Sequence, residues 1–394
     1  MANVSSSNGL EKRPKLRFPG FDEPWKETAL SSVLTERNEY AEKDGTYEHA
    51  TLSKEGIYGK TARYDRDFLV STENKKYKVT HLGDLCYNPA NLKFGVICLN
   101  TYGDAIFSPI YVTFEIEASF DPDFIGAYLT RWDFINRALK YQQGTVYERM
   151  AVSPEDFVSI KCCFPQKAEQ TRLAEFITLL DKRIAAQGKY VESLKKYKRG
   201  LLSSVFSQNV SLFSTAAFYA FSELAVRRSE KYDPKCNAHA VCIELEHIEQ
   251  ETGRIIGSTC ADYQNSIKTV CKPGDVMFGK LRPYLRKYAF VQKECVCSSE
   301  IWSLIPTDIV IPKYLFYLIQ SEAFMKAANV SSGTKMPRAE WSTIAKSGYP
   351  IPSKDDQQAT VDILETTDRI IVSHVASYNR LIEYKKGLLQ RLFI

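Results

Sequence analysis

The sequence contains no apolar run of about 18 residues, so no transmembrane helix is predicted. The stretch from Met1 to Lys15 is polar and lacks the apolar core of a secretory signal. We therefore expect residues 1–21 to form a disordered or extended N-terminal arm, and the protein to be cytoplasmic. No Walker-type phosphate loop occurs, which argues against ATP hydrolysis by this chain. The net charge of only +5 permits nucleic-acid binding without showing it.

Recognisable catalytic motifs are also lacking, and none of the five histidines lies in a nucleophile motif. Tyr87-Asn88-Pro89-Ala90 is similar to the Asn-Pro-Pro-aromatic loop with which amino-methyltransferases grip a flipped adenine. The second proline and the aromatic residue are missing, and no glycine-rich cofactor loop precedes it. We predict a simple turn here and no catalytic residues.

The ten cysteines lie mostly within strand-like apolar runs such as Val96–Cys98 and Val241–Ile243. Without a secretion signal they are expected to be reduced and to act as small buried apolar side chains. Cys236-x-x-His239-x-x-Cys242 has the residue types of a zinc site, but it offers three ligands with no second pair nearby. We therefore predict no metal site.

What the chain does contain is an internal repeat. Residues 165–206 and 352–393 both begin with Pro-x-Lys-x-x-Gln and end with Tyr-Lys-(Arg/Lys)-Gly-Leu-Leu-x-x-(Val/Leu)-Phe. Pro352 lies 187 residues after Pro165, and this offset is kept by Gln170/Gln357, Asp181/Asp368, Tyr197/Tyr384, Gly200/Gly387 and Phe206/Phe393. A fainter match pairs Gly83-Asp84-Leu85 with Gly274-Asp275-Val276. A repeat of this length indicates a duplicated domain, because solenoid repeats span about 20–50 residues.

Residues 22–165 and 207–352 are predicted to be mixed α/β segments, each large enough for its own core. Gly-Asp and Asn-Pro pairs punctuate them. The strand-like runs are Val96–Leu99, Ile110–Ile116 and Val270–Phe278, and the helical patterns are Pro122–Leu139 and Pro312–Ala328.

Residues 166–206 and 353–394 are predicted to be long helices packed on each other, because apolar residues recur at alternating spacings of three and four. The seam residues are Leu173, Ile177, Leu180, Ile184, Val191 and Leu194 in the first copy, and Leu364, Ile371, Tyr378, Leu381 and Leu388 in the second. Polar residues interrupt the seam at Gln187, Lys198, Thr360, Thr367, His374 and Lys385. The lysines and arginines of the outer faces are either simply solvated or part of a partner-binding surface.

Basic and aromatic residues gather in a few loops. In the second half these are Lys280, Arg282, Tyr284, Arg286 and Lys287, and the corresponding place in the first half holds Asn88, Asn91 and Lys93. A second pair of loops carries Tyr147, Arg149, Lys335 and Arg338. Such side chains suit phosphates and base edges, so we predict that they bind DNA. The alternative is a solvated basic loop.

In these features the chain resembles the specificity subunits of type I restriction–modification enzymes. The resemblance runs from Arg17-Phe18-Pro19-Gly20-Phe21-x-x-Pro24-Trp25 to Leu392-Phe393, and the twice-repeated Pro-x-x-x-x-Gln to Gly-Leu-Leu-x-x-x-Phe segment is its most specific part. It implies a pseudo-twofold tandem duplication of mixed α/β fold, with two target-recognition domains separated by two long antiparallel coiled-coil helices. Ile394 is then expected near Pro24.

The resemblance also implies partners. They are double-stranded DNA, two methyltransferase subunits and, through the complex, restriction subunits. The chain itself would catalyse nothing and hold no cofactor, with S-adenosylmethionine, ATP and Mg²⁺ in the partner subunits. Each recognition domain would read one half of a split target, and the partner methyltransferases would flip and methylate an adenine.

Two alternatives stay open at this point. One is a DNA methyltransferase or nuclease with an unrecognised catalytic motif, which a methyl-transfer or cleavage assay on the lone chain would detect. The other is a tandem-domain scaffold that does not bind DNA, which would show no salt-dependent DNA binding.

Overall fold

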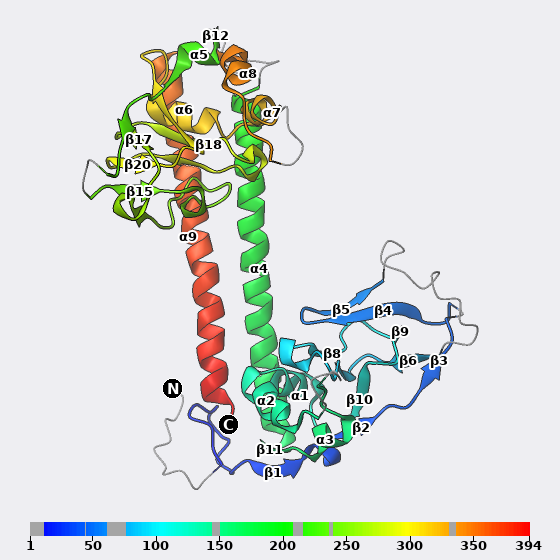
Figure 1. Ribbon diagram of the computed structural model, residues 1–394. Helices are drawn as coiled ribbons and strands as arrows, with labels where there is room; N and C mark the ends of the chain where they lie inside the picture. The colour runs from blue at the N-terminus through cyan, green and yellow to red at the C-terminus, as the bar shows by residue number, and fades with distance from the viewer. Residues whose placement is uncertain are drawn as a thin grey trace. The chain divides into compact units, whose positions relative to one another are not determined.

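The computed structural model describes residues 12–43, 45–60, 76–143, 150–207, 216–235, 239–330 and 336–394. Its contacts divide the chain into two compact units (Figure 1). Unit 1 comprises Met1–Ala186 with Asn379–Ile394, and unit 2 comprises Gln187–Tyr378. No helix within the described ranges is both long and apolar enough to span a bilayer.

Unit 1 holds three sheets with the strand orders β1-β11, β2-β10-β7-β8 and β3-β6-β9-β4-β5. The strands are β1 (Lys26–Ala29), β2 (Leu34–Glu36), β3 (Tyr40–Ala41), β4 (Glu48–Ser53), β5 (Gly56–Gly59), β6 (Tyr77–Thr80), β7 (Leu85–Tyr87), β8 (Ile97–Leu99), β9 (Ala105–Phe107), β10 (Val112–Ile116) and β11 (Lys161–Phe164). The short helices are α1 (Pro122–Leu129), α2 (Trp132–Ala138) and α3 (Pro154–Ser159), with 3-10 turns η1 (Leu30–Ser32), η3 (Leu92–Phe94) and η4 (Leu139–Tyr141).

Unit 2 holds the same three kinds of sheet, in the orders β12-β22, β13-β21-β18-β19 and β14-β17-β20-β15-β16. The strands are β12 (Ala217–Ala220), β13 (Ala225–Arg227), β14 (Lys231–Tyr232), β15 (Val241–Ile243), β16 (Thr259–Cys260), β17 (Lys268–Cys271), β18 (Val276–Gly279), β19 (Tyr288–Phe290), β20 (Cys295–Cys297), β21 (Ile301–Pro306) and β22 (Gly348–Ile351). The short helices are α5 (Phe221–Leu224), α6 (Pro312–Leu318), α7 (Glu322–Ala328) and α8 (Trp341–Lys346), with 3-10 turns η5 (Leu245–His247), η6 (Ala261–Tyr263) and η7 (Pro283–Leu285).

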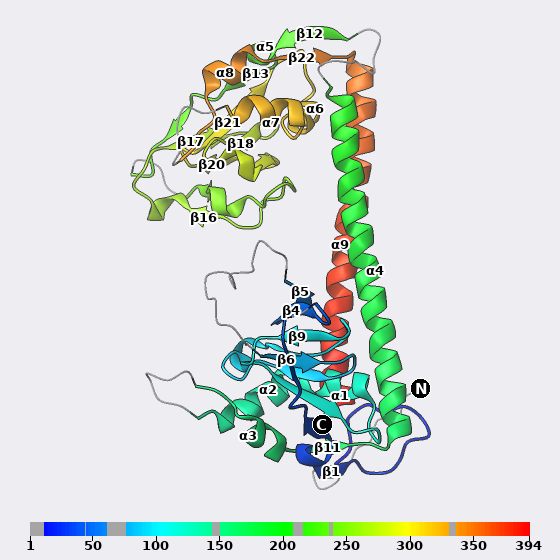
Figure 2. The same ribbon diagram turned by 90° about the vertical axis from the view of Figure 1, so that its right-hand side faces the viewer.

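The two sheet-bearing bodies are therefore copies of one topology (Figure 2). Every strand of unit 1 has a counterpart in unit 2, in the same order. Even the unusual parallel pair recurs, as β4 with β9 and as β15 with β20, while the other pairs are antiparallel. The predicted mixed α/β fold with tandem duplication is confirmed.

Local boundaries differ from the predictions where a turn is hidden in an apolar run. The predicted strand over Val270–Phe278 is two strands, because β17 ends at Cys271 and β18 begins at Val276. Gly274 makes the turn between them with a φ of +94°, a conformation that glycine adopts without steric penalty.

Each predicted short helix is likewise interrupted. The pattern over Pro122–Leu139 forms α1, α2 and η4, and the pattern over Pro312–Ala328 forms α6 and α7. At the second break the Ser321 hydroxyl accepts a hydrogen bond from the Phe324 amide at 3.2 Å and so caps the start of α7. Apolar periodicity does not show these breaks because both pieces bury their apolar faces in the same core.

The disordered or extended arm expected over residues 1–21 forms no helix or strand over residues 12–21, and this part packs on unit 1. Arg17 makes a two-pronged contact with the buried carboxylate of Glu169, with both N–O distances at 2.7 Å. The ring of Phe18 packs edge-on against Phe176 at 5.6 Å. This segment is therefore held on unit 1, and residues 1–11 lie outside the described residues.

The long helices are α4 (Lys167–Val205) and α9 (Lys354–Leu392), and they run antiparallel (Figure 1). The predicted seam residues on both helices are all buried or half-buried. Two polar interruptions of the seam meet each other in unit 2, where Gln187 Nε2 donates to the His374 carbonyl at 3.1 Å and lies 3.0 Å from its Nδ1. Gln187 and His374 are repeat counterparts, so equivalent positions of the two helices touch here.

The two lysines that interrupt the seam, Lys198 and Lys385, form equivalent ion pairs in the two units. In unit 2, Lys198 Nζ lies 2.7 Å from a carboxylate oxygen of Asp368. In unit 1, Lys385 pairs with Asp181. Because Lys385 and Asp368 are the repeat counterparts of Lys198 and Asp181, each unit makes the same ion pair with the roles of α4 and α9 exchanged.

The glutamine of the repeated motif joins each long helix to its sheet-bearing body. Gln170 accepts a hydrogen bond from the backbone N–H of Asp121 and donates to the Pro165 carbonyl, both at 2.9 Å. Gln357 accepts from the N–H of Ile311 at 2.8 Å and donates to the carbonyl of its own motif proline at 3.0 Å. The buried side chain satisfies one backbone donor and one backbone acceptor in each unit, which explains its repetition.

The end of the chain lies where it was expected within unit 1. The rings of Phe393 and Trp25 are 6.4 Å apart in an edge-to-face arrangement, and Arg131 donates to the carbonyl of Ile394 at 3.2 Å. In unit 2 the repeat counterpart of Phe393, Phe206, packs against a buried tyrosine of α6 at 5.1 Å. The last phenylalanine of each repeat thus closes an aromatic core.

The two reciprocal ion pairs differ in burial, and this predicts different stability effects. The Lys198 side chain is 10% exposed and its Nζ also donates to Gln320, whereas the Lys385 side chain is 27% exposed. Lys198→Met should lower the free energy of unfolding by about 2 kcal/mol, since it leaves a partly buried carboxylate unpaired. Lys385→Met is the matched control and should change it by less than about 1 kcal/mol. Urea unfolding of the full chain measures both, and equal effects would contradict the assignment.

Candidate nucleic-acid interface

The same ion pair anchors the turn before β7 in unit 1 and the turn before β18 in unit 2. In unit 1 the Arg37 guanidinium contacts both carboxylate oxygens of Asp84, at 2.9 and 3.0 Å. In unit 2 Arg228 contacts both oxygens of Asp275, at 2.6 and 2.7 Å. The two aspartates are the repeated Gly-Asp residues of the sequence, and each hydrogen bond raises the pKa of its arginine. These arginines are held inside the fold and are not available to a ligand.

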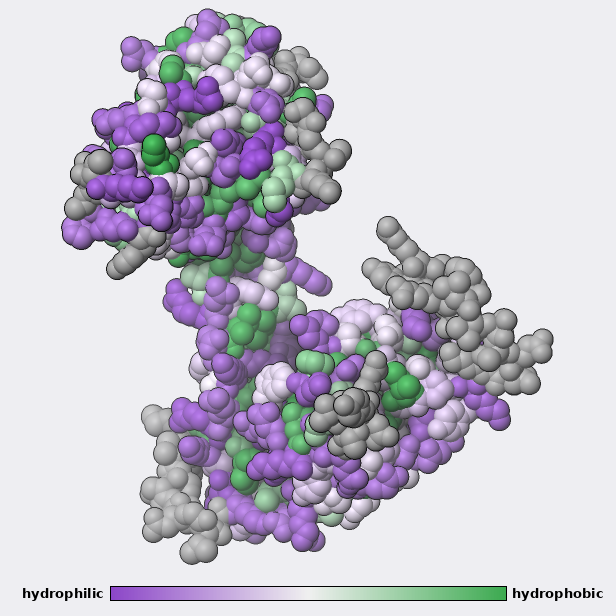
Figure 3. All heavy atoms as spheres, in the orientation of Figure 1, coloured by the Kyte–Doolittle hydropathy of each residue, from purple (hydrophilic) through white to green (hydrophobic). Residues whose placement is uncertain are grey.

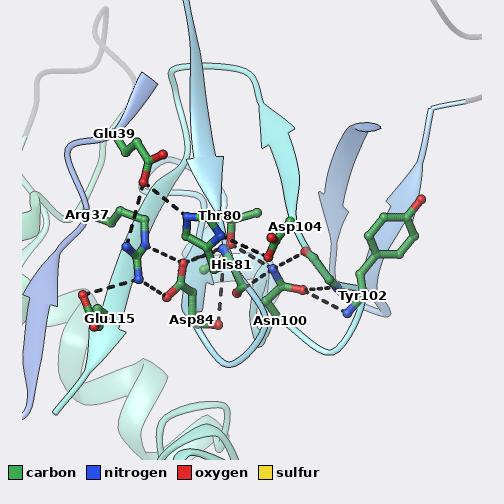
Figure 4. A network of polar contacts seen from close by, with 11 residues as sticks. Arg37, Glu39, Thr80, His81, Asp84, Asn100, Tyr102, Asp104 and Glu115 are labelled. Atoms are coloured by element: carbon green, nitrogen blue, oxygen red, sulfur yellow. Dashed lines mark hydrogen bonds and ion pairs between the residues drawn. The ribbon is translucent and has the colours of Figure 1, made fainter. Parts of the chain in front are cut away.

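Around Asp84 the polar side chains form hydrogen bonds and ion pairs with one another (Figure 4). Asn100 Nδ2 donates to the carbonyl of His81 at 2.8 Å, and the His81 ring lies between Glu39 at 3.2 Å and Asp104 at 3.0 Å. Burial opposes protonation of His81, but hydrogen bonds to Asp104 and Glu39 outweigh it and raise the pKa of the ring. The network fixes the loops beside β6 and β7, which is a structural role.

Each anchored strand leads into an equivalent 3-10 turn, η3 after β7 and η7 after β18. The turn is tied to the second predicted loop by one backbone hydrogen bond, which is repeated. Val152 N donates to the Pro89 carbonyl at 3.3 Å in unit 1, and Ala339 N donates to the Lys280 carbonyl at 2.8 Å in unit 2. In unit 2 the loop carrying Arg338 therefore lies beside the loop carrying Lys280 and Arg282, and Leu281 also pairs with Arg338 in an isolated bridge.

In unit 1 the predicted residues divide between structure and surface. Asn88 is buried and its side-chain oxygen accepts from the Ala90 and Asn91 amides at 3.1 and 3.2 Å, so it stabilises the turn and does not face a ligand. Asn91 is half-buried, and Lys93 is exposed with its ammonium 5.2 Å from the centre of the Phe94 ring.

Two exposed aromatic residues in unit 1 were missed by the sequence analysis. Phe94 is 60% exposed and Trp132 is 57% exposed. Trp132 lies beside the residue that follows Phe94, since a Cβ added at Gly95 would be 3.6 Å from the Trp132 ring. Exposed aromatic rings beside a lysine suit stacking on bases. The sequence does not show which aromatic side chains are exposed, so it could not identify these two.

In unit 2 the turn η7 presents Arg282 and Tyr284 to solvent, with Tyr284 54% exposed. Arg282 adopts a left-handed conformation with φ at 53°, as does Arg286 at 50°, on the two sides of the turn. A left-handed arginine is uncommon and carries some backbone strain. The turn η7 therefore has a left-handed residue on each side, Arg282 before it and Arg286 after it.

The remaining predicted basic residues of this stretch bind within the protein. Arg286 contacts Glu322 at 2.6 Å, and Lys287 Nζ donates to the Leu245 carbonyl at 2.6 Å. Arg338 is bidentate with Glu300 at 3.1 Å. Lys280 is half-buried, and Tyr147, Arg149 and Lys335 lie outside the described residues.

A basic groove in unit 2 was also missed. Its volume is about 640 Å³, and it is lined by strands β13, β14 and β21 and by α8. Arg227 lies over two tryptophan rings, 5.8 Å from Trp302 and 5.0 Å from Trp341, and Lys231 and Lys280 complete its basic lining. Hydrophilic residues dominate the visible face of unit 2 (Figure 3).

The available cations of unit 2 can be identified from their partners. Within the described part of the chain, Arg227, Lys280 and Arg282 have no carboxylate in ion-pair contact. A groove with cations that lack a carboxylate partner among the described residues, two indoles packed edge-to-face and several hydroxyls can accept phosphates and the planar edges of bases.

The long helices also carry an exposed repeated feature. Tyr197 and Tyr384 are repeat counterparts and are 59% and 60% exposed. Three residues later on the same helical face stand Gly200 and Gly387, where an added Cβ would meet nothing within 4 Å. Glycine inside a helix costs about 1 kcal/mol relative to alanine, and nothing in the described chain requires it at these positions.

Known proteins are similar to this chain in sequence and in fold. A family model described as the type I restriction modification DNA specificity domain matches residues 231–381. The MjaVIII type I restriction enzyme specificity subunit of Methanocaldococcus jannaschii is 22% identical over 269 residues, which are 61% of this chain and 63% of that one. The HindI type I restriction enzyme specificity subunit of Haemophilus influenzae is 28% identical over 145 residues, 35% of this chain and 31% of that one. The chain thus spans less than two thirds of the length of these relatives.

Solved structures share the whole architecture. A chain from work on complex assembly and conformational transition of the type I R-M system superimposes with a TM-score of 0.60 at 15% identity, covering 95% of this chain and 98% of that one. The type I restriction-modification S subunit from M. genitalium gives 0.55 at 15% identity, covering 97% and 99%. At this identity the likeness shows the fold. Residues 231–381 thus match the type I restriction modification DNA specificity domain, and the chain is similar to the specificity subunits of type I restriction–modification systems.

Proposed function

We propose that this chain is the sequence-specific DNA-binding subunit of a type I restriction–modification complex and that each sheet-bearing body reads one half of a split target. The observation that carries the proposal is the basic and aromatic surface of unit 2, which lies largely within the matched domain of residues 231–381. Unit 1 supports it with the equivalent turn η3 and its exposed Lys93 and Phe94. The protein is proposed to be cytoplasmic, where its DNA substrate would be.

The chemistry of the surface divides affinity from sequence choice. Lysine and arginine contacts to phosphates supply affinity on any DNA, whereas arginine and stacked aromatic contacts to bases supply selectivity. The Arg227 guanidinium lies 5.8 Å from the centre of the Trp302 ring and 5.0 Å from that of Trp341, and a planar guanidinium suits the paired acceptors of a guanine edge. Arg282 and Tyr284 stand free on a turn of fixed shape.

The two left-handed arginines of η7 provide a matched test of this surface. Arg282→Ala should weaken binding to the cognate DNA by about 1–3 kcal/mol and leave stability unchanged, because its side chain has no carboxylate partner in the described chain. Arg286→Ala has the same backbone strain but removes the 2.6 Å contact to Glu322, so it should lower stability and leave DNA affinity nearly unchanged.

Fluorescence anisotropy with cognate and scrambled duplexes at several salt concentrations measures both variants in the assembled complex. Weakening on the cognate duplex alone indicates base contact, and equal weakening with a flatter salt dependence indicates phosphate contact. Unchanged binding by Arg282→Ala on both duplexes would remove η7 from the interface.

The partners are proposed to be two methyltransferase subunits, with restriction subunits joining through the complex. What supports this is the exposed Tyr197 with Gly200 in unit 2 and Tyr384 with Gly387 in unit 1. An exposed ring beside a helical glycine allows a partner backbone to approach closely, and the same surface is offered twice. S-adenosylmethionine, ATP and Mg²⁺ would then be held by the partners.

Alanine at these glycines should separate stability from assembly. Gly200→Ala and Gly387→Ala should each raise the free energy of unfolding by about 1 kcal/mol, since alanine is the better helix former. Each should weaken methyltransferase binding about tenfold, because the added methyl group enters the interface. Gly188→Ala is the contrast, since its Cβ would meet the Tyr378 ring at 3.1 Å and should not stabilise the chain. Calorimetric titration with the methyltransferase subunit tests the point, and full affinity in both variants would place the partner elsewhere.

The chain is proposed to have no methyltransferase or nuclease activity of its own. Asn88, the residue nearest in type to an adenine-gripping asparagine, is buried in a turn, with its side-chain oxygen already accepting two amide hydrogen bonds. Purified alone, the chain should transfer no methyl group to DNA, and activity should appear on adding the methyltransferase subunit. Methyl transfer by the lone chain at the rate of the complex would refute this.

A further inference from the structure

A group of three potential metal ligands lies at one edge of the five-stranded sheet of unit 2. His239 Nδ1, Cys260 Sγ and a carboxylate oxygen of Asp262 all lie within 4.8 Å of one another. Cys260 ends β16, and Asp262 lies in the following turn η6. This differs from the set suggested by the Cys236-x-x-His239-x-x-Cys242 spacing, which the sequence analysis set aside.

Strand register explains why these residues meet. β15 and β16 are antiparallel with Val241 opposite Cys260, and the ladder continues as Ala261 N donates to the Ala240 carbonyl at 2.9 Å. Counting two residues outward from the Val241 pair places His239 opposite Asp262. Asp262 lies in the turn η6 directly after β16, and this turn brings its carboxylate close to the Cys260 thiol.

The Cys242 thiol takes no part in this group. It is fully buried in a small apolar cluster with Val296, and its Sγ lies 3.6 Å from a carboxylate oxygen of Glu244. Burial raises the pKa of Cys242 to about 12, which disfavours the thiolate form that a metal requires. Cys260 is only half-buried, so its thiol is accessible to an ion from solvent.

The geometry around Asp262 prepares it as a ligand. One carboxylate oxygen accepts the backbone N–H of His239 at 3.0 Å, and the other lies 2.8 Å from its Nδ1. His239 has a φ of 62°, which places its imidazole beside Asp262 while leaving the side chain 85% exposed.

We propose that His239, Cys260 and Asp262 form a binding site for a divalent transition-metal ion of the zinc type. One imidazole nitrogen, one thiolate and one carboxylate are the ligand types that Zn²⁺ takes in tetrahedral sites, and solvent would fill the fourth position. The Cys260 thiol gives its proton to solvent when the ion binds, so the two ligand charges neutralise the metal. Bound metal would join the segment before β15 to the end of β16.

This site does not depend on the proposed DNA-binding function, and its test uses metal alone. The full chain, reduced and freed of metal with a chelator, is titrated with Co²⁺. One equivalent should bind with the near-ultraviolet charge-transfer absorption of a cobalt–thiolate bond, and Zn²⁺ should displace it. Zn²⁺ should also raise the melting temperature of the wild-type chain.

Variants assign the ligands. Cys260→Ser should abolish the charge-transfer band. Asp262→Asn and His239→Ala should each weaken Zn²⁺ binding about tenfold or more, because even the loss of a residue that only contacts a ligand has an effect of about this size. Cys163→Ser is the matched control, because Cys163 is also half-buried but lies in β11 of unit 1.

Two results would overturn the site. One is the absence of any charge-transfer band in the wild-type chain. The other is a band that persists in Cys260→Ser while far-ultraviolet circular dichroism shows the variant to be folded, because the thiolate would then be another cysteine.

Discussion

The structure depends first on the register between α4 and α9, and polar side chains set that register. An apolar seam of leucines and isoleucines tolerates sliding by a heptad, because each turn offers nearly the same surface. Gln187 against His374 and Lys198 against Asp368 in unit 2, and Lys385 against Asp181 in unit 1, are each satisfied in one alignment only. These interruptions make the seam less apolar and make it specific, as buried polar residues do in other coiled coils.

The repeat then determines what each helix end must hold. The motif glutamine bridges the helix start to the neighbouring body, and the motif phenylalanine closes an aromatic core, in both units. The Arg–Asp pairs of the first turn are likewise made twice. Residues kept in both copies thus make internal contacts, with the exception of the exposed tyrosines and glycines of the long helices, which is why we assign those four to partners.

The candidate DNA surface follows the opposite rule, because its side chains differ between the copies. The backbone link between the turn and the second loop is the same in both units, but it presents Lys93 and Phe94 in one and Arg282 and Tyr284 in the other. We propose that this common scaffold, with different exposed residues, lets one fold read two unlike half-targets. The strained left-handed arginines of η7 occur only in unit 2 within the described residues, so they belong to its particular surface and not to the shared scaffold.

The sequence by itself determined the duplication, the two long helices and the α/β class, because a constant offset and a heptad seam are properties of spacing. It could not distinguish cations that face solvent from those consumed inside the protein. Arg282 and Arg286 stand four residues apart in one basic run, yet one is free and the other contacts Glu322, a residue from a different helix. Asn88 was predicted to bind DNA but is buried, whereas the groove lined by Arg227 was not predicted from the sequence. Only tertiary structure decided these roles, because burial and ion pairing arise from residues brought together across strands and helices that local spacing does not connect.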